Sequence, residues 1–325
     1  MESARPPALT WVRPATGDPA RPVEFFVEVR NNTEVPCDGR LSLFFPTTVS
    51  RMAHELFPAS REYALQPGRS AVWRVRGDIT SETPTGRFSV FVLAEGSARH
   101  SAAADLPITI LDATLPAGLS VGVFTSYDDT LAEALENLGA AVVELDGARM
   151  PFVDLSGFDS VFVDLRAYLV HPQLAQYNSL LLDYARAGGN LVVMYQKTEE
   201  WKSELAPYPL VLGRERVTLE DAPVTLLEPT HPLLSWPNVL DAGAWQGWVQ
   251  ERGLYFPREV DSRYTRLVSM ADAGGEPLST GWLVADAGKG SYIYTSLVWY
   301  RQLRERRPGA YQALANMAAY PRRPR

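Results

Sequence analysis

The hydrophobic pattern changes about one third of the way along the chain, and this change most strongly constrains the fold. Across residues 23–110, short apolar segments recur between turn residues. After residue 119, strand-like apolar segments alternate with helical segments that end at glycine. The first pattern is typical of an all-β sandwich, and the second is typical of an α/β domain built on parallel strands. The sequence therefore predicts two domains, 1–112 and 118–325, joined near Pro116.

The first domain is expected to be an immunoglobulin-like β-sandwich. Residues 71–76 alternate apolar and polar side chains with the period of two that a half-buried strand requires. Gln66-Pro67-Gly68 and Pro84-Thr85-Gly86 precede strand-like segments and have the composition of turns. The predicted strands are 23–30, 41–45, 71–76, 88–93 and 106–111.

The second domain is expected to contain an open, doubly wound sheet. Its predicted helices are 130–138, which ends at Gly139, a segment from Pro172 through Tyr184 that closes at Gly188-Gly189, and 310–319. Its predicted strands are 119–124, 191–195, two short buried strands at 141–145 and 160–164, and an antiparallel pair at 281–285 and 291–295.

Composition excludes several functional classes. A net charge of -7 argues against nucleic-acid binding, which requires clusters of Lys and Arg. No run of about 18 apolar residues occurs, so no membrane span is expected. The single cysteine, Cys37, permits no intramolecular disulfide and no thiolate-based zinc site. No signal peptide is visible, which predicts a cytoplasmic protein, or an exported one if the chain belongs to a longer polypeptide.

The second domain resembles class I glutamine-amidotransferase-like domains, in its strand order and in the Gly288-Lys289-Gly290 turn before Tyr292. More specifically, the motifs DLRAY, GGNLVVMYQKTEEW, APY, WVQERGLYFP and PGAY resemble the region after the catalytic domain in large bacterial PIG-L family deacetylases. The sandwich, through Leu65-Gln66-Pro67-Gly68 and similar motifs, resembles modules attached to glycosidases. The resemblance implies an association with the deacetylation of N-acetylglucosaminyl compounds and a PIG-L type deacetylase as a partner.

Two departures from these families bear on catalysis. None of the four histidines lies in the His-Pro-Asp-Asp-Glu type segment that binds zinc in PIG-L deacetylases. Amidotransferases place a cysteine on a sharp turn after a central strand, but Gln196-Lys197-Thr198 follows the corresponding strand here. The sequence therefore predicts no catalytic residue, no metal site and no cofactor.

Ligands of open α/β sheets bind at the carboxyl ends of the strands. Polar and aromatic residues follow several predicted strands, and such a mixture suits a polyol, because charged groups bond its hydroxyls and rings cover its apolar face. The predicted ligand-binding residues are Arg166, Tyr168, Lys197, Glu199, Trp201, Gln250, Glu251 and Arg252.

Each candidate also has a structural interpretation. Asp128 and Asp129 suit the first turn of a helix, where the dipole favours carboxylates. Arg166 could form a structural ion pair with Glu199 or Glu251 instead of binding a ligand. His231, which precedes Pro232, has no second metal ligand nearby in the sequence.

Three functions follow from these observations. The first is a non-catalytic accessory protein that binds a carbohydrate-like ligand or a partner enzyme. The second is a hydrolase with a cysteine-free site in which Glu199 or Glu251 acts as base with His231. The third is a structural module in which the aromatic loop around Trp248 forms an oligomer interface.

Overall fold

The computed structural model describes residues 9–45, 59–96 and 101–324. It divides into two compact units, Met1–Asp112 and Ala113–Arg325. The division falls at the start of the segment that the sequence suggests as a linker. Each unit has its own hydrophobic core.

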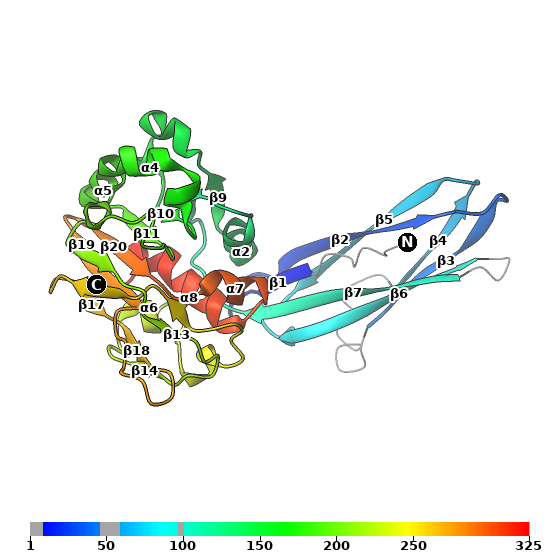
Figure 1. Ribbon diagram of the computed structural model, residues 1–325. Coiled ribbons are helices and arrows are strands. Elements are labelled where there is room, and N and C mark those ends of the chain that lie inside the picture. Colours follow the sequence, from blue (N-terminus) through cyan, green and yellow to red (C-terminus); the bar gives the residue numbers. More distant parts are fainter. Residues whose placement is uncertain (1–8, 46–58, 97–100, 325) are drawn as a thin grey trace. The chain divides into compact units, whose positions relative to one another are not determined.

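The first unit has a sandwich-like arrangement of two sheets (Figure 1). One sheet has the order β1-β7-β6-β3-β4, and the other pairs β2 with β5. Val23, Phe25, Trp73 and Val75 from the smaller sheet pack in one core with residues of the larger sheet such as Leu43. The strands are β1 (Leu9–Arg13), β2 (Arg21–Arg30), β3 (Cys37–Phe44), β4 (Ser60–Leu65), β5 (Ser70–Ile79), β6 (Gly86–Gly96) and β7 (Ser101–Asp112).

The five strands expected in this unit all form, and the structure adds β1 and β4. The sequence of β4, Ser60–Leu65, contains Ser, Arg and Glu, and most of its residues are exposed. It lies at an edge of its sheet, where one face and one side meet solvent, so its apolar pattern is weak. An edge strand of this kind gives little periodic signal in a sequence.

The second unit is built around a sheet with the order β17-β19-β20-β11-β10-β8-β9. Pairing is parallel from β20 through β11, β10 and β8 to β9, whereas β19 pairs antiparallel with both β20 and β17. The strands are β8 (Ser120–Phe124), β9 (Ala141–Glu144), β10 (Ser160–Val163), β11 (Asn190–Val193), β17 (Thr265–Arg266), β19 (Trp282–Ala287) and β20 (Gly290–Thr295).

Helices connect and cover these strands (Figure 1). Leu181, Leu182 and Ala185 of α5 pack with alternate residues of β10 and β11. The side chains of Ser160 and Asn190, at the starts of β10 and β11, donate hydrogen bonds to carbonyls of α8. The helices are α2 (Thr130–Leu138), α3 (Ala167–Val170), α4 (Pro172–Gln176), α5 (Asn178–Ala187), α6 (Pro232–Ser235), α7 (Trp299–Arg304) and α8 (Pro308–Ala319).

Several local predictions can be compared with these elements. Helix α2 ends at Gly139, whose φ of 99° lies in the left-handed region, as the sequence predicts. Gly288-Lys289 forms the tight turn of the β19–β20 hairpin. The segment from Pro172 is two helices, because the chain leaves helical geometry at Tyr177. Strand β9 was expected to be buried, but it lies at the sheet edge and is mostly exposed.

The segment between β11 and β19 forms small two-stranded sheets. They pair β12 (Leu210–Leu212) with β16 (Pro257–Val260), β13 (Arg216–Val217) with β15 (Gly253–Leu254), and β14 (Val224–Leu226) with β18 (Val268–Met270). The β13–β15 pairing is continued by a bridge from Gly253 to Leu297, which brings the chain around residue 253 beside the carboxyl end of β20. This insertion therefore supplies side chains to that edge of the sheet.

Candidate functional site

The parallel strands end together, so the loops that follow them gather at one edge of the sheet. Phe124 of β8 pairs with Val163 of β10, Val163 with Val193 of β11, and Val193 with Tyr294 of β20. The segments after these four residues therefore meet at the carboxyl edge. Ligands of open α/β sheets bind at this edge, because loops there converge while the strands hold them rigidly.

Arg166 and Glu200 form the first ion pair of this edge. The Arg166 guanidinium donates two hydrogen bonds to the Glu200 carboxylate, at 2.8 and 3.0 Å. The Glu200 side chain is 3% exposed and also accepts a hydrogen bond from the Lys197 backbone N–H at 2.9 Å. The pairing raises the pKa of Arg166 further above its ordinary value. The expected partners were Glu199 or Glu251, but Glu199 is exposed and Glu251 pairs elsewhere.

Glu251 and Arg301 form a second ion pair, with an N–O distance of 3.0 Å. The Glu251 side chain is only 10% exposed, and its burial raises its pKa although Arg301 opposes the change. Arg301 Nε also donates to the phenol oxygen of Tyr300 at 2.7 Å. A carboxylate from the insertion is thus attached to α7, which follows β20 in the sequence.

Tyrosine rings lie next to the two ion pairs. The Tyr195 ring lies 6.0 Å from the Tyr255 ring and 6.1 Å from the Tyr300 ring, measured between centroids. Lys197 Nζ lies 5.6 Å from the centroid of Tyr255, in a cation–π contact. We call this set the tyrosine–arginine cluster; its members are Arg166, Tyr195, Lys197, Glu200, Glu251, Tyr255, Tyr300 and Arg301.

Backbone strain is concentrated around the cluster. Arg166, Gln250, Glu251 and Tyr255 have φ angles of 52°, 65°, 150° and 56°, in the region that favours glycine. Gln250 is exposed, and its backbone N–H donates to Glu220 at 2.5 Å. Such conformations cost free energy and tend to persist at functional sites, where the surrounding structure holds them in place.

A buried carboxyl lies beside the cluster, at the end of β10. Asp164 is 5% exposed, and its Oδ2 accepts a hydrogen bond from the Ser126 hydroxyl at 3.1 Å. Burial raises the pKa of Asp164 to about 7. The nearby Arg304 is ion-paired with Asp128. Asp164 and Asp128 line a cavity of about 10 Å³ together with Tyr195 and Tyr300, which is room for no more than one water molecule.

Three predicted ligand-binding residues belong to the core instead. Tyr168 is 3% exposed and donates to Asn178 Oδ1 at 2.7 Å, and Trp201 is 7% exposed and donates to the Leu210 carbonyl at 2.8 Å. Arg252 is 3% exposed and bonds the carbonyls of Ala222 and Trp245, while burial lowers its pKa to about 10. Each side chain is buried and hydrogen-bonded within its own unit, which gives it a structural role in the fold.

The aromatic loop around Trp248 is also part of the core. Trp248 is 2% exposed, and its ring lies 5.0 Å from that of Trp299 and 5.4 Å from that of Trp245. Phe256, which belongs to the same predicted aromatic group, is 1% exposed. These rings are covered within their own unit, so they do not form the surface that an oligomer interface would require.

His231 is attached to α6 and α8 and not to the carboxyl edge. Its Nδ1 accepts a hydrogen bond from the Leu233 backbone N–H at 3.2 Å, and its ring stacks on Tyr320 at 5.7 Å. Burial lowers the pKa of His231. In the described residues, no hydrogen bond or ion pair links it to Glu199 or Glu251, so the predicted hydrolytic pair does not assemble.

The turn after β11 holds Gln196, Lys197 and Thr198. Gln196 is fully buried, and its amide nitrogen donates to the carbonyls of Asp164 and Met194. Within the described ranges, the Thr198 hydroxyl has no hydrogen bond to a carboxylate or an imidazole that would activate it. The Lys197 backbone N–H donates to Glu200, so a backbone donor of the kind that stabilises an oxyanion is already engaged.

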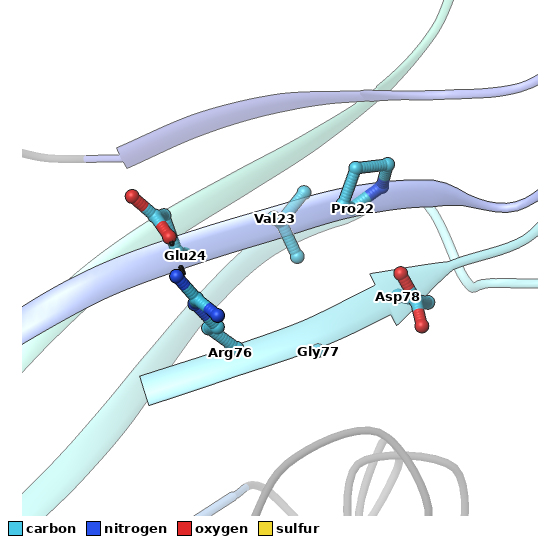
Figure 2. Close-up of a pocket in the computed structure, with 6 residues that line it drawn as sticks. All are labelled: Pro22, Val23, Glu24, Arg76, Gly77 and Asp78. Atoms are coloured by element: carbon cyan, nitrogen blue, oxygen red, sulfur yellow. Dashed lines mark hydrogen bonds and ion pairs between the residues drawn. The ribbon is translucent and has the colours of Figure 1, made fainter. Parts of the chain in front are cut away.

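The sandwich also carries an open groove, of about 550 Å³, along β2 and β5 (Figure 2). Pro22, Val23, Gly77 and Asp78 line it together with Glu24 and Arg76. Glu24 accepts hydrogen bonds from Arg74 at 2.6 Å and from Arg76 at 3.3 Å, so its carboxylate is engaged on the strand surface. The groove has no aromatic lining residue, and the tyrosine–arginine cluster is the better candidate for ligand binding.

Among the described residues, no group of three or more His, Cys, Asp or Glu side chains is arranged to hold a metal ion. In the same residues, none of the helices is both long enough and apolar enough to span a bilayer.

Comparison with known proteins gives only remote similarities. No family model and no curated protein matches the chain. A β-galactosidase from Rahnella sp. R3 is 17% identical with a TM-score of 0.37, and the match covers 62% of this chain and 31% of that chain. The exo-β-1,4-mannosidase Op5Man5 from Opitutaceae bacterium strain TAV5 is 12% identical with a TM-score of 0.37, covering 62% and 35%.

A family 123 glycoside hydrolase from Clostridium perfringens is 10% identical with a TM-score of 0.25, covering 57% of this chain and 33% of that chain. The chain thus spans about a third of the length of each of these glycoside hydrolases.

Proposed function

We propose that this chain is a non-catalytic accessory region that binds a carbohydrate-like ligand at the tyrosine–arginine cluster. The observation that supports this is the grouping of partly exposed Tyr255 and Tyr300 with charged groups that are already fixed in position. Aromatic faces cover the apolar side of a sugar ring. Guanidinium and carboxylate groups that are already fixed can bond its hydroxyls with little further loss of side-chain entropy.

The absence of turnover is part of the proposal. The amidotransferase nucleophile position is occupied by Gln196-Lys197-Thr198, and the Lys197 N–H is bonded to Glu200. The motif resemblance to the C-terminal region of PIG-L family deacetylases suggests the context: an immunoglobulin-like sandwich with an amidotransferase-like domain that assists a deacetylase acting on N-acetylglucosaminyl compounds. The partner enzyme would then supply the chemistry.

A sugar panel tests the proposal. Thermal stability would be measured with mono- and oligosaccharides, including amino sugars, because a ligand that binds only the folded state raises its stability. A sugar that raises the melting temperature is expected to lose this effect in Tyr300→Ala. The matched control is Tyr63→Ala, which removes a partly exposed tyrosine from the sandwich and should leave the effect intact.

The opposite response of the two variants would assign ligand binding to the sandwich. If Tyr63→Ala abolishes the effect while Tyr300→Ala preserves it, the sandwich holds the ligand and the cluster does not. If no sugar in the panel changes the melting temperature of the unmodified chain, the carbohydrate proposal is wrong.

A further inference from the structure

The ion pairs of the cluster present their positive members to solvent. In the Arg166–Glu200 pair the arginine side chain is 20% exposed and the glutamate side chain 3%. In the Arg301–Glu251 pair the values are 25% and 10%. Because each glutamate side chain is more buried than its arginine partner, an incoming ligand meets the arginine side chains first.

Lys197 adds a cation that has no carboxylate partner. Across the ranges that the structure describes, its ammonium group forms no ion pair, and its contact is the Tyr255 ring at 5.6 Å. The side chain is half-buried, so it has less conformational freedom than a fully exposed lysine. A lysine ammonium group offers three hydrogen-bond donors and no acceptor, which favours an anionic or hydroxyl partner.

Negative charges around the cluster do not cancel this arrangement. Asp128 is engaged by Arg304, and Glu200 and Glu251 are engaged by their arginines. Glu199 is exposed to solvent, and in the described residues it forms no ion pair. Among the charged side chains of the cluster, Arg166 and Arg301 are therefore more exposed than their carboxylate partners, and Lys197 adds an unpaired ammonium group on the Tyr255 ring.

We propose that the cluster selects acidic sugars, whose carboxylate or sulfate group binds Lys197 and the outward-facing guanidinium groups of Arg166 and Arg301 while a tyrosine ring covers the sugar. The inference rests on the proposed carbohydrate-binding function and names the ligand class of that same site. Charge-assisted hydrogen bonds to such groups are stronger than bonds to neutral hydroxyls, and planar guanidinium groups can hold a carboxylate through two bonds.

Titration calorimetry tests this with matched pairs of sugars. Oligosaccharides of galacturonate and glucuronate are compared with the corresponding neutral galactose and glucose oligosaccharides, and a sulfated oligosaccharide forms a third arm. We expect the anionic members to bind roughly tenfold more tightly than the neutral ones. Their affinity should also fall as salt is raised, because ions screen partly exposed charges.

Lys197→Met is the decisive variant, because methionine keeps most of the apolar stem and removes the charge. It should weaken the binding of anionic sugars several-fold more than the binding of neutral sugars, and Lys197→Arg should keep the preference. Lys289→Met is the control, since Lys289 lies at the amino end of β20, opposite the edge that carries the cluster.

The outcomes separate this inference from the function on which it rests. Tighter binding of uronates or of sulfated sugars supports it, and the arm that binds best identifies the anionic group. Equal or weaker binding of the anionic sugars, or an unchanged preference in Lys197→Met, overturns it while neutral binding leaves the carbohydrate function standing. Failure of every sugar overturns both.

Discussion

Asp164 should make the stability of the second unit depend on pH. Its burial raises its pKa from the ordinary 3.8 to about 7, so folding favours the protonated form. The stability that the neutral carboxyl contributes is complete below pH 4 and is lost as pH rises towards 7 and beyond. This difference in pKa between the unfolded and folded states corresponds to about 4 kcal/mol of unfolding free energy, lost between about pH 4 and pH 7.

The structure explains why ionisation is costly. The cation that acts on Asp164, Arg304, is paired with Asp128, and the direct side-chain donor to the carboxyl is the neutral Ser126 hydroxyl. Tyr195 and Tyr300 line the adjoining cavity, which is too small to hydrate a carboxylate.

Asp164→Asn isolates this contribution, because an amide has nearly the same shape and does not ionise. The unfolding transition of the second unit would be followed between pH 4 and 9 by near-ultraviolet circular dichroism, since buried Trp282 and Trp299 belong to this unit. The variant should lose less stability than the unmodified chain as pH rises, and it should be the more stable of the two at pH 8. Asp183→Asn, at an exposed carboxylate, is the control. Parallel pH profiles for the unmodified chain and Asp164→Asn would refute the reasoning.

Three substitutions test the packing around the sheet by chemical denaturation. Gly290→Ala should cost about 2 to 3 kcal/mol, because its Cβ would lie 2.1 Å from a backbone oxygen, whereas Gly157→Ala meets no atom within 4 Å and should be neutral. Arg166→Ala should cost about 3 to 5 kcal/mol by leaving a buried carboxylate unpaired, and adding Glu200→Gln should recover most of that loss; no recovery would contradict a structural ion pair. Asn316→Ala should cost about 3 kcal/mol, because the fully buried amide donates to two backbone carbonyls and accepts a backbone N–H; a loss below 1 kcal/mol would contradict this.

The sequence predicts the main elements because their signals are local. Helix α2 has a glycine at its end, and β10 and β11 each contain three consecutive apolar residues after a polar first residue, a pattern typical of buried parallel strands. Elements whose pattern depends on distant neighbours are harder to recognise. Strand β4 is polar because it lies at a sheet edge, and the two-residue strands β13 and β15 are defined only by their pairing with each other, Arg216 with Leu254 and Val217 with Gly253.

The candidate site is predictable in position but not in its pairings. Strand order places Arg166 and Lys197 at one edge, since both follow parallel strands. The local conformation of the turn after β11 decides which carboxylate pairs with Arg166. Glu199 and Glu200 are adjacent in the sequence, but Glu199 is exposed and the Glu200 side chain is buried against Arg166. Tyr300 and Arg301 were missed because they lie about 100 residues further on, and the preceding buried strand β20 is the one signal that could have indicated them.

The turn after β11 bears on both parts of the proposed function, ligand binding and the absence of turnover. A backbone N–H that stabilises an oxyanion must be free to bond the developing charge, but the N–H of Lys197 is bonded to Glu200. The same bond holds Glu200 in place for Arg166, whose side chain is the more exposed member of the ion pair. Under the proposed function, the hydrogen bond that engages this N–H therefore also fixes the partner of Arg166, so both parts of the proposal depend on the arrangement of Glu200.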